Sequence, residues 1–200
     1  MTLAGTPFRH GDHVCAPFDS PEEQLAVAAA FIADGLRRNE RCLFAGASGE
    51  TLAQFRAELR SQGTDADSAH ARGALLLLTS AEAHLPDGRF SSERMLRMLN
   101  DAVEQALDDG YAGLRTCGDM TWLLDEPAGS AEVVEYEALV TQLFKDVRAL
   151  GMCQYDARRL PPRLLAYGLR NHPTVVIDRR HAANVFRDET GPDTGDRQAM

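Results

Sequence analysis

The sequence has neither a long apolar run nor a surplus of positive charge. A membrane-spanning helix needs roughly 20 consecutive apolar residues, and no stretch of the chain approaches that length. The first residues, MTLAGTPFRHGDH, lack the basic and apolar regions of a signal peptide. We therefore expect a cytoplasmic protein that does not associate with membranes.

The chain is also poor in the features that bind nucleic acids or build disulfide frameworks. Its formal net charge is −9, whereas nucleic-acid binding draws on clustered Lys and Arg, so we expect no direct nucleic-acid partner. The four cysteines are widely spaced and include no C-x-x-C pair. In a cytoplasm such cysteines are expected to be thiols. They are Cys15, Cys42, Cys117 and Cys153.

What the chain does contain is a strand, a turn of small residues and a helical pattern between Arg41 and Leu59. This order is typical of phosphate-binding loops, in which backbone N–H groups at a helix N-terminus face an anion. However, Glu50 stands where a P-loop needs its lysine, and the loop is one residue short. We interpret the segment as a degenerate P-loop, which comprises Gly46, Ser48, Gly49, Glu50 and Thr51.

Apolar stretches alternate with helical patterns along the rest of the chain. We expect strands at 14–18, 42–45, 73–78, 113–120, 152–156 and 174–178, and helices at 21–38, 50–62, 91–109, 131–150 and 163–171. Ser20, Pro21 and Glu23 form a strong helix start, and Gly151 is expected to end the fourth helix. The pattern predicts an α/β fold of three layers, with a mostly parallel central sheet flanked by helices.

One domain accounts for this pattern. We expect a flexible leader at 1–9, a single domain at 10–186 and a disordered polar tail at 187–200. In parallel sheets, ligands collect beyond the carboxyl ends of the strands. That rule selects residues 46–51, 79–80, 117–122 and 155–159.

Three motifs resemble a known family. They are GDHVCAPFDSPEEQ, GLRTCGDMTWLL and MCQYDARRLPP, the last followed by NHP. Together they resemble the MEDS domain, a DcmR-type sensory domain of methanogens and methylotrophs, over about residues 10 to 185. The positions that match its motifs are His13, Cys15, Gly118, Asp119, Trp122, Tyr155, Asp156, His172 and Pro173.

The resemblance implies a RecA/KaiC-like fold whose catalytic loop has decayed. It also implies sensing of small molecules, with halogenated or other hydrocarbon derivatives proposed as ligands. Family members are often fused to a DNA-binding or histidine-kinase module, for which this chain has no room. We therefore expect a separate kinase or transcription regulator to receive the signal, while the oligomeric state, including a homo-oligomer, stays open.

The motifs and the strand ends together suggest a ligand site. Its candidate residues are His13, Cys15, Cys117, Asp119, Trp122, Tyr155 and Asp156. On a strand, His13 and Cys15 point to one face, either as a ligand-binding or redox pair in which the imidazole lowers the thiol pKa, or as ordinary buried side chains. A metal or haem held by His10, His13 and Cys15 is conceivable, but H-x-x-H-x-C is a weak signature. We expect no metal and no cofactor.

The other candidates also have two interpretations. Asp119 occupies the place of the Mg²⁺-binding acid of RecA-like ATPases, and we interpret it as a structural carboxylate or a ligand contact. Trp122 forms either a pocket wall or ordinary core. Asp156 pairs with Arg158 or Arg159 across the site, or in a surface salt bridge. His172 is interpreted as a helix C-terminal cap that interacts with the dipole, and Cys117 and Cys153 also fit plain core positions.

The sequence thus predicts a non-enzymatic sensory domain. It would bind a small, largely apolar ligand and regulate a partner in transcriptional or two-component signalling. Two alternatives remain: a ligand-free interaction module that regulates an anti-sigma or histidine kinase, and a residual nucleotide-binding enzyme.

Overall fold

The computed structural model describes residues 7–177 and 180–184, and these residues form a seven-stranded sheet in the order β3-β2-β4-β5-β1-β6-β7. All neighbouring strands run parallel except β6 and β7. The predicted mostly parallel sheet is therefore confirmed. The strands are β1 (His13–Phe18), β2 (Arg41–Gly46), β3 (Leu75–Thr79), β4 (Leu114–Asp119), β5 (Ala149–Asp156), β6 (Thr174–Ile177) and β7 (Arg180–Ala183).

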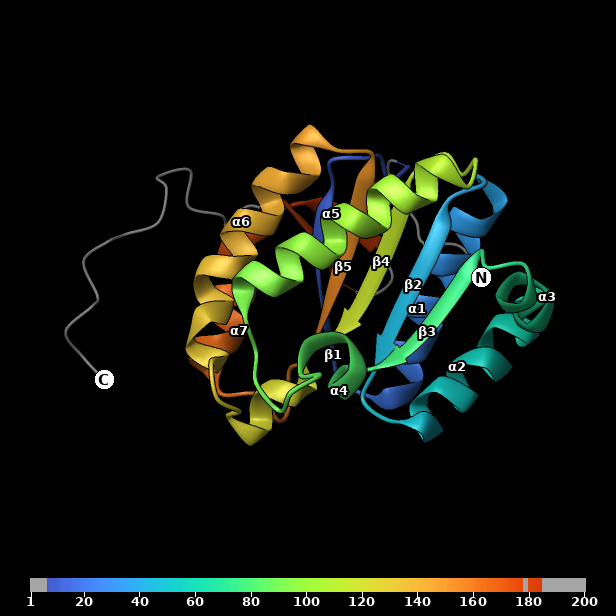
Figure 1. The fold of residues 1–200 in the computed structure, drawn as a ribbon. Coiled ribbons are helices and arrows are strands. Elements are labelled where there is room, and N and C mark those ends of the chain that lie inside the picture. Colours follow the sequence, from blue (N-terminus) through green and yellow to red (C-terminus); the bar gives the residue numbers. More distant parts are fainter. Residues whose placement is uncertain (1–6, 178–179, 185–200) are drawn as a thin grey trace.

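Helices cover both faces of this sheet, which gives the predicted three layers. In Figure 1, α5 crosses in front of the strands and α6 lies along their left side, while α1 lies behind them with α2 packed against it at the lower right. No described helix is long and apolar enough to cross a membrane. The helices are α1 (Pro21–Arg37), α2 (Gly49–Ser61), α3 (Ala66–Ala71), α4 (Ser80–His84), α5 (Ser92–Asp108), α6 (Val133–Asp146) and α7 (Pro162–Asn171), with 3₁₀ turns at Thr121–Asp125 and Ser130–Glu132.

Each face of the sheet has its own hydrophobic core. Under α1 and α2, the rings of Phe44 and Phe55 stack with centroids 3.8 Å apart. Under α5, α6 and α7, the core includes Phe90, Tyr136 and Phe144. The second core is the one that encloses the candidate site.

The start of α1 matches its prediction. Ser20 Oγ accepts a hydrogen bond from the Glu23 N–H, and the Glu23 carboxylate accepts one from the Asp19 N–H. Pro21, which has no N–H to leave unpaired, occupies the first turn.

A buried arginine joins α1 to the sheet. Arg115 of β4 is fully buried, and it contacts the carboxylates of Glu40 at 2.6 Å and Asp34 at 3.2 Å. Its guanidinium also lies 4.7 Å from the ring centroid of Phe31.

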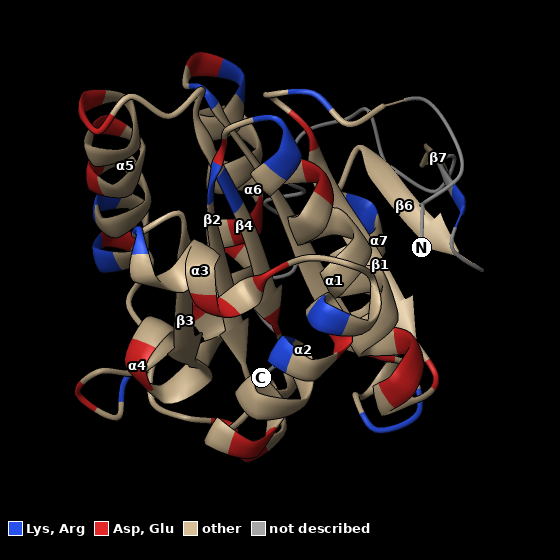
Figure 2. Cartoon of the chain, turned by 90° about the vertical axis from the view of Figure 1, so that its right-hand side faces the viewer, with Lys and Arg blue, Asp and Glu red and all other residues tan. Residues whose placement is uncertain are grey.

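Elsewhere, Figure 2 shows acidic and basic segments interspersed over the helices and loops.

Several predicted boundaries are wrong. The fourth predicted helix ends at Asp146 rather than 150, and β5 begins at Ala149. Gly151 lies inside β5, opposite His13, so it does not terminate the helix. A side chain there would collide with the ring of Phe144, which lies 2.6 Å from an added Cβ. The position therefore needs glycine for close packing.

The sequence also missed three short elements. The segments 64–72 and 81–90 lie between the predicted elements, yet the first contains α3 and the second contains most of α4. Strand β7 was not predicted. Phe8, assigned to the leader, is buried and packs edge-on against Phe31 at 5.1 Å. The expected tail at 187–200 lies outside the described residues.

Candidate functional site: a small apolar pocket and a buried polar cluster

A pocket of about 50 Å³ lies between the sheet and the helices α4, α5 and α6. One water needs about 10–15 Å³ of such space, so the pocket has room for roughly four waters or a ligand of a few heavy atoms. Its lining is mostly apolar and includes Leu43, Ala45, Ala83, Met95, Met98, Leu99, Met120, Val140 and Phe144.

A glycine helps to keep this pocket open. Gly118 of β4 lines it, and a Cβ at this position would lie 3.6 Å from His84 Nε2, an ordinary contact distance. The residue could therefore carry a methyl group, but that group would occupy pocket space. Gly118 belongs to the sequence motif GLRTCGDMTWLL.

An aromatic stack supports the wall opposite Gly118. Trp122 is buried, and its ring lies nearly parallel to that of His84 at 5.3 Å and to that of Phe90 at 5.0 Å. Burial lowers the pKa of His84 to about 4, so its imidazole is neutral near pH 7. Trp122 thus packs against His84, which lines the pocket, and is not itself a lining residue.

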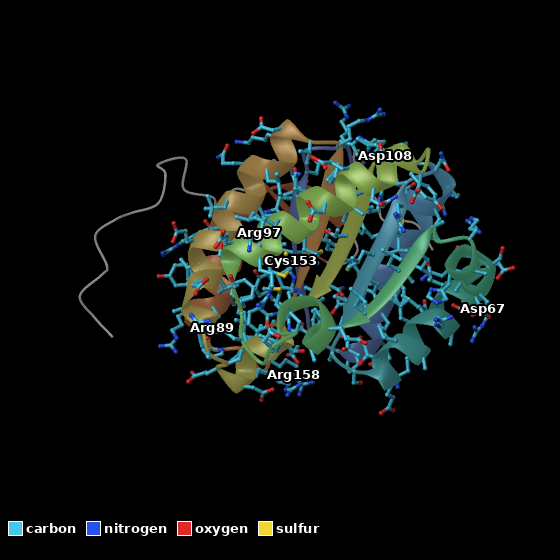
Figure 3. The ribbon with its side chains drawn as sticks, viewed as in Figure 1. Asp67, Arg89, Arg97, Asp108, Cys153 and Arg158 are labelled. Atoms are coloured by element: carbon cyan, nitrogen blue, oxygen red, sulfur yellow. The ribbon has the colours of Figure 1, made fainter. Side chains whose placement is uncertain are left out.

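Beside the pocket, four polar side chains from four elements face one another. They are His13 of β1, Glu137 of α6, Cys153 of β5 and His172, the C-cap residue that follows α7. Their nearest ligand atoms all lie within 4.8 Å of one another. His13 and Cys153 also line the pocket. In Figure 3, Cys153 lies between the sheet and the helices on its near face.

Glu137 is at the centre of this polar cluster. Its Oε2 lies 3.4 Å from His13 Nε2 and 3.4 Å from His172 Nε2. The thiol of Cys153 lies 3.5 Å from His13 Nε2 and 3.8 Å from Glu137 Oε2. The other carboxylate oxygen, Oε1, accepts a 2.8 Å hydrogen bond from the hydroxyl of Tyr155.

Hydrogen bonds fix the orientation of both imidazoles. The single proton of the Thr141 hydroxyl is directed at the carbonyl oxygens of Glu137 and Asn171, each 3.0 Å from Oγ1, so the hydroxyl oxygen accepts the N–H of His13 Nδ1 at 2.8 Å. His172 Nδ1 donates to the carbonyl of Gly168 at 2.6 Å. Each Nε2 therefore directs a lone pair toward Glu137 Oε2.

Burial also sets the charge of the cluster. It lowers the pKa of His13 well below the ordinary range, with a smaller contribution from His172, and that of His172 to about 4. Burial raises the pKa of Glu137 to about 7, against the opposing hydrogen bonds from Tyr155 and Cys153. Burial, followed by the Glu137 charge, also raises the pKa of the Cys153 thiol. The uncharged forms are therefore favoured when nothing else is bound.

The sequence prediction missed Glu137. Along α6, the buried residues Val133, Tyr136, Val140 and Phe144 recur at helical spacing. Glu137 falls inside this apolar stripe, where an unpaired carboxylate is costly. A carboxylate on the buried face of an amphipathic helix was the available signal.

One predicted ligand residue belongs to the cluster, a second contacts it, and one interpretation is wrong. His13 is the member, and Tyr155 contacts the cluster because its hydroxyl donates to Glu137 Oε1. Cys15 is fully buried nearby, and burial raises its thiol pKa, so it is not activated by an imidazole. The thiol beside the His13 imidazole is that of Cys153. The conceivable triad with His10 does not form either, because His10 Nε2 pairs with a Glu40 oxygen at 3.2 Å.

The remaining predicted contacts lie outside the cluster. Cys117 lines the pocket, but it shares a strand face with Arg115 and belongs to the core under α1. Asp119 accepts the N–H of Thr121 at 2.8 Å and so forms a turn at the end of β4. Asp156 likewise accepts the N–H groups of residues 158 and 159, and its ion pair with Arg159, at 3.9 Å, is local.

His172 combines a predicted and an unpredicted role. Its Nδ1 caps α7 as expected, but the ring is neutral, so the expected interaction of a charge with the helix dipole is wrong. The unpredicted role is the approach of its Nε2 to Glu137.

The loop between β2 and α2 is short. Gly46 ends β2, and Gly49 begins α2. Ser48 caps the helix by accepting the Thr51 N–H at 3.2 Å. Glu50 is exposed in the first turn. The Thr51 N–H at this helix N-terminus is thus already hydrogen-bonded within the chain, and the charged side chain in the first turn, Glu50, is negative.

Most of the sequence matches a family model. The match, to "MEDS: MEthanogen/methylotroph, DcmR Sensory domain", covers residues 12–173. The chain belongs to the MEDS family. His13, Glu137 and Cys153 all lie within the matched residues, and His172 lies one residue before the end of the match.

Solved structures confirm the RecA/KaiC-like fold of this MEDS domain. The flagellar accessory protein FlaH from Methanocaldococcus jannaschii is similar with a TM-score of 0.60 and 13% identity, over 86% of this chain and 71% of that one. The KaiC-like protein PH0186 from Pyrococcus horikoshii OT3 is similar with a TM-score of 0.55 and 14% identity, over 83% and 70%. No curated protein matches the sequence.

Proposed function

We propose that this MEDS domain senses a small, largely apolar molecule that binds in the pocket beneath α4, α5 and α6. The sensory character of the family supports a signalling role. The observation that carries the proposal is the pocket itself: about 50 Å³, apolar over most of its lining, with a few polar groups such as His84 and Cys153. One- to three-carbon alcohols, amines and haloalkanes match this size and polarity.

Binding would be read by a separate partner protein, and the domain would act without catalysis. A ligand shifts a conformational equilibrium only if it binds one arrangement better than the other. The pocket is walled by α5 and α6, and these helices also expose Leu107 and Leu139. A ligand that moves either helix would therefore alter an apolar part of the outer surface, where a kinase or transcription regulator could bind.

The proposal is tested by thermal unfolding of chelator-treated protein with a panel of such compounds. At 100 times its dissociation constant, a ligand stabilises the folded state by about 2.7 kcal/mol, which raises Tm by roughly 5–10 °C for a domain of this size. The variant Gly118→Ala should abolish or strongly weaken the shift, because its methyl group takes up pocket space. Gly49→Ala is the matched control, since its Cβ would meet nothing within 4 Å.

Two results would overturn the proposal: no compound in the panel raises Tm, or Gly118→Ala binds as well as wild type. The first result, combined with a specific protein partner, would favour a ligand-free interaction module. ATP with Mg²⁺ belongs in the same panel. Stabilisation by ATP that is lost in a variant of the β2–α2 loop would favour a nucleotide-binding protein instead.

A further inference from the structure

We propose that His13, Glu137, Cys153 and His172 bind one transition-metal ion of the Zn²⁺ type. This inference goes beyond the proposed function, because it concerns the polar cluster beside the pocket and does not depend on any small-molecule ligand. It rests on the spacing of four ligand atoms, on the hydrogen bonds that orient them, and on the balance of charge in a buried site.

The spacing fits a tetrahedral ion. With metal–nitrogen and metal–oxygen bonds of about 2.0 Å and a metal–sulfur bond of about 2.3 Å, ligand atoms around a tetrahedral Zn²⁺ are separated by about 3.3–3.6 Å. The cluster has N–O separations of 3.4 and 3.4 Å, an N–S separation of 3.5 Å and an O–S separation of 3.8 Å. The two remaining separations, from the ligand nitrogen of His172 to the ligand atoms of His13 and Cys153, do not exceed 4.8 Å. Small side-chain adjustments would therefore complete the tetrahedron.

The surrounding hydrogen bonds are those of a metal site. Metal-binding histidines donate their second ring N–H to a carbonyl or another acceptor, which fixes the tautomer and ring orientation. Both histidines do so here, His13 to Thr141 Oγ1 and His172 to the Gly168 carbonyl. The ligating carboxylate is likewise held by Tyr155.

The charges also balance. Zn²⁺ with one thiolate, one carboxylate and two neutral imidazoles sums to zero, which suits a site in which three of the four ligand residues are fully enclosed. Binding would form two metal–nitrogen bonds, one metal–oxygen bond and one metal–sulfur bond, and from the uncharged cluster it would release two protons to solvent, one from the Cys153 thiol and one from the Glu137 carboxyl. His172 Nε2 is buried and makes no hydrogen bond in the structure, so the metal would also satisfy this atom.

The ligand set selects the kind of metal. Thiolate and imidazole favour Zn²⁺ and similar borderline or soft ions over Mg²⁺ and Ca²⁺, which prefer oxygen ligands. Four protein ligands fill a tetrahedral coordination sphere, as in structural zinc sites. The ion would therefore join β1, β5, α6 and α7 rather than perform a reaction. It would also lie against the pocket, because His13 and Cys153 line both.

The first test uses wild-type protein that carries no polyhistidine tag, after chelator treatment. We expect one equivalent of Zn²⁺ to bind and to raise Tm, with no effect of Mg²⁺. Titration with Co²⁺ should give the intense visible bands of a tetrahedral ion and a thiolate-to-cobalt charge-transfer band. Absence of stoichiometric Zn²⁺ binding, or an octahedral Co²⁺ spectrum without the thiolate band, would overturn the proposal.

Variants then assign the site. Cys153→Ser should lose the charge-transfer band, whereas Cys42→Ser should keep it, because Cys42 lies in the other core and its thiol already faces the carbonyls of Ile32 and Glu40. Thr141→Val leaves all four ligands in place and should weaken Zn²⁺ binding about 10–100-fold. A thiolate band that survives in Cys153→Ser would contradict the assignment.

The two proposals can fail separately. The small-molecule panel is run on chelator-treated protein, and the metal titration is run without any panel compound. Metal binding without a panel response would remove only the proposed ligand class. A panel response without metal binding would leave a metal-free hydrogen-bonded cluster beside a working pocket.

Discussion

Two glycines on the same face of the sheet should respond to alanine in opposite ways. A Cβ at Gly151 would lie 2.6 Å from Phe144 Cε2 and 2.9 Å from Thr116 Oγ1. Carbon atoms prefer separations of about 3.5–4.0 Å, so the Phe144 ring would have to move by about 1 Å. That ring is buried and packs edge-on against His13 at 5.6 Å. The strain therefore reaches the polar cluster.

Two opposing effects set the change in the free energy of unfolding that Gly151→Ala should cause. Overpacking a well-packed core costs about 1–3 kcal/mol, and the loss of glycine's freedom in the unfolded chain returns about 0.4–1 kcal/mol. We expect Gly151→Ala to lower the free energy of unfolding by about 1–2 kcal/mol. Gly118→Ala meets only ordinary contacts at 3.6 and 3.7 Å, so it should be neutral or more stable by up to about 1 kcal/mol.

Urea unfolding followed by circular dichroism measures the difference. With a slope of about 2 kcal/mol/M, the midpoint of Gly118→Ala should exceed that of Gly151→Ala by about 1 M, with equal slopes. Coincident midpoints, or the reverse order, would refute the packing argument for both positions. They would also remove the reason to regard Gly118 as a residue that keeps the pocket open.

Three further predictions concern stability. Burial lowers the pKa of His84 from 6.5 to about 4. Between these pH values the unfolded chain binds a proton that the folded chain does not, so the free energy of unfolding is unaffected by His84 above pH 6.5 and decreases as the pH falls toward 4. This change amounts to about 3 kcal/mol, and urea midpoints of His84→Gln should fall less steeply over this range than those of wild type; parallel profiles would contradict the prediction. Arg115→Met removes the guanidinium from the buried Glu40 carboxylate, which then keeps only its contact with His10, and should cost about 3–5 kcal/mol, part of which Glu40→Gln should restore in the double variant. No recovery would show that the charge is not the cause. Ser48→Ala removes the cap of α2 and should cost about 1 kcal/mol in urea unfolding, and an unchanged midpoint would show that this cap contributes little.

The sequence predicted those parts of the fold that depend on local patterns. The start of α1 could be predicted because Ser20, Pro21 and Glu23 act within one turn. The central strands could be predicted because continuous apolar runs are typical of parallel strands buried on both faces. The end of α6 could not, since Gly151 is required by the ring of Phe144 and not by a helix terminus.

The candidate site was only partly predictable for a related reason. The motifs pointed to His13, which lies in the polar cluster, and to Tyr155, whose hydroxyl donates to Glu137 of that cluster. The rule that places ligands beyond strand ends selected Asp119 and Asp156, which instead form local turns. Glu137 carried no motif and lies 124 positions after His13 in the chain. Glu137 meets His13 and Cys153 only because α6 packs over β1 and β5, and this packing belongs to the tertiary structure.

The position of β1 has a consequence for synthesis of the chain. This strand is made before the other six described strands, yet its neighbours in the sheet are β5 and β6, which end at Asp156 and Ile177. On the ribosome, its backbone N–H and C=O groups must therefore stay unpaired until nearly the whole domain has emerged. Exposed strand edges of this kind favour aggregation, so the nascent domain should depend on chaperones more than its small size suggests.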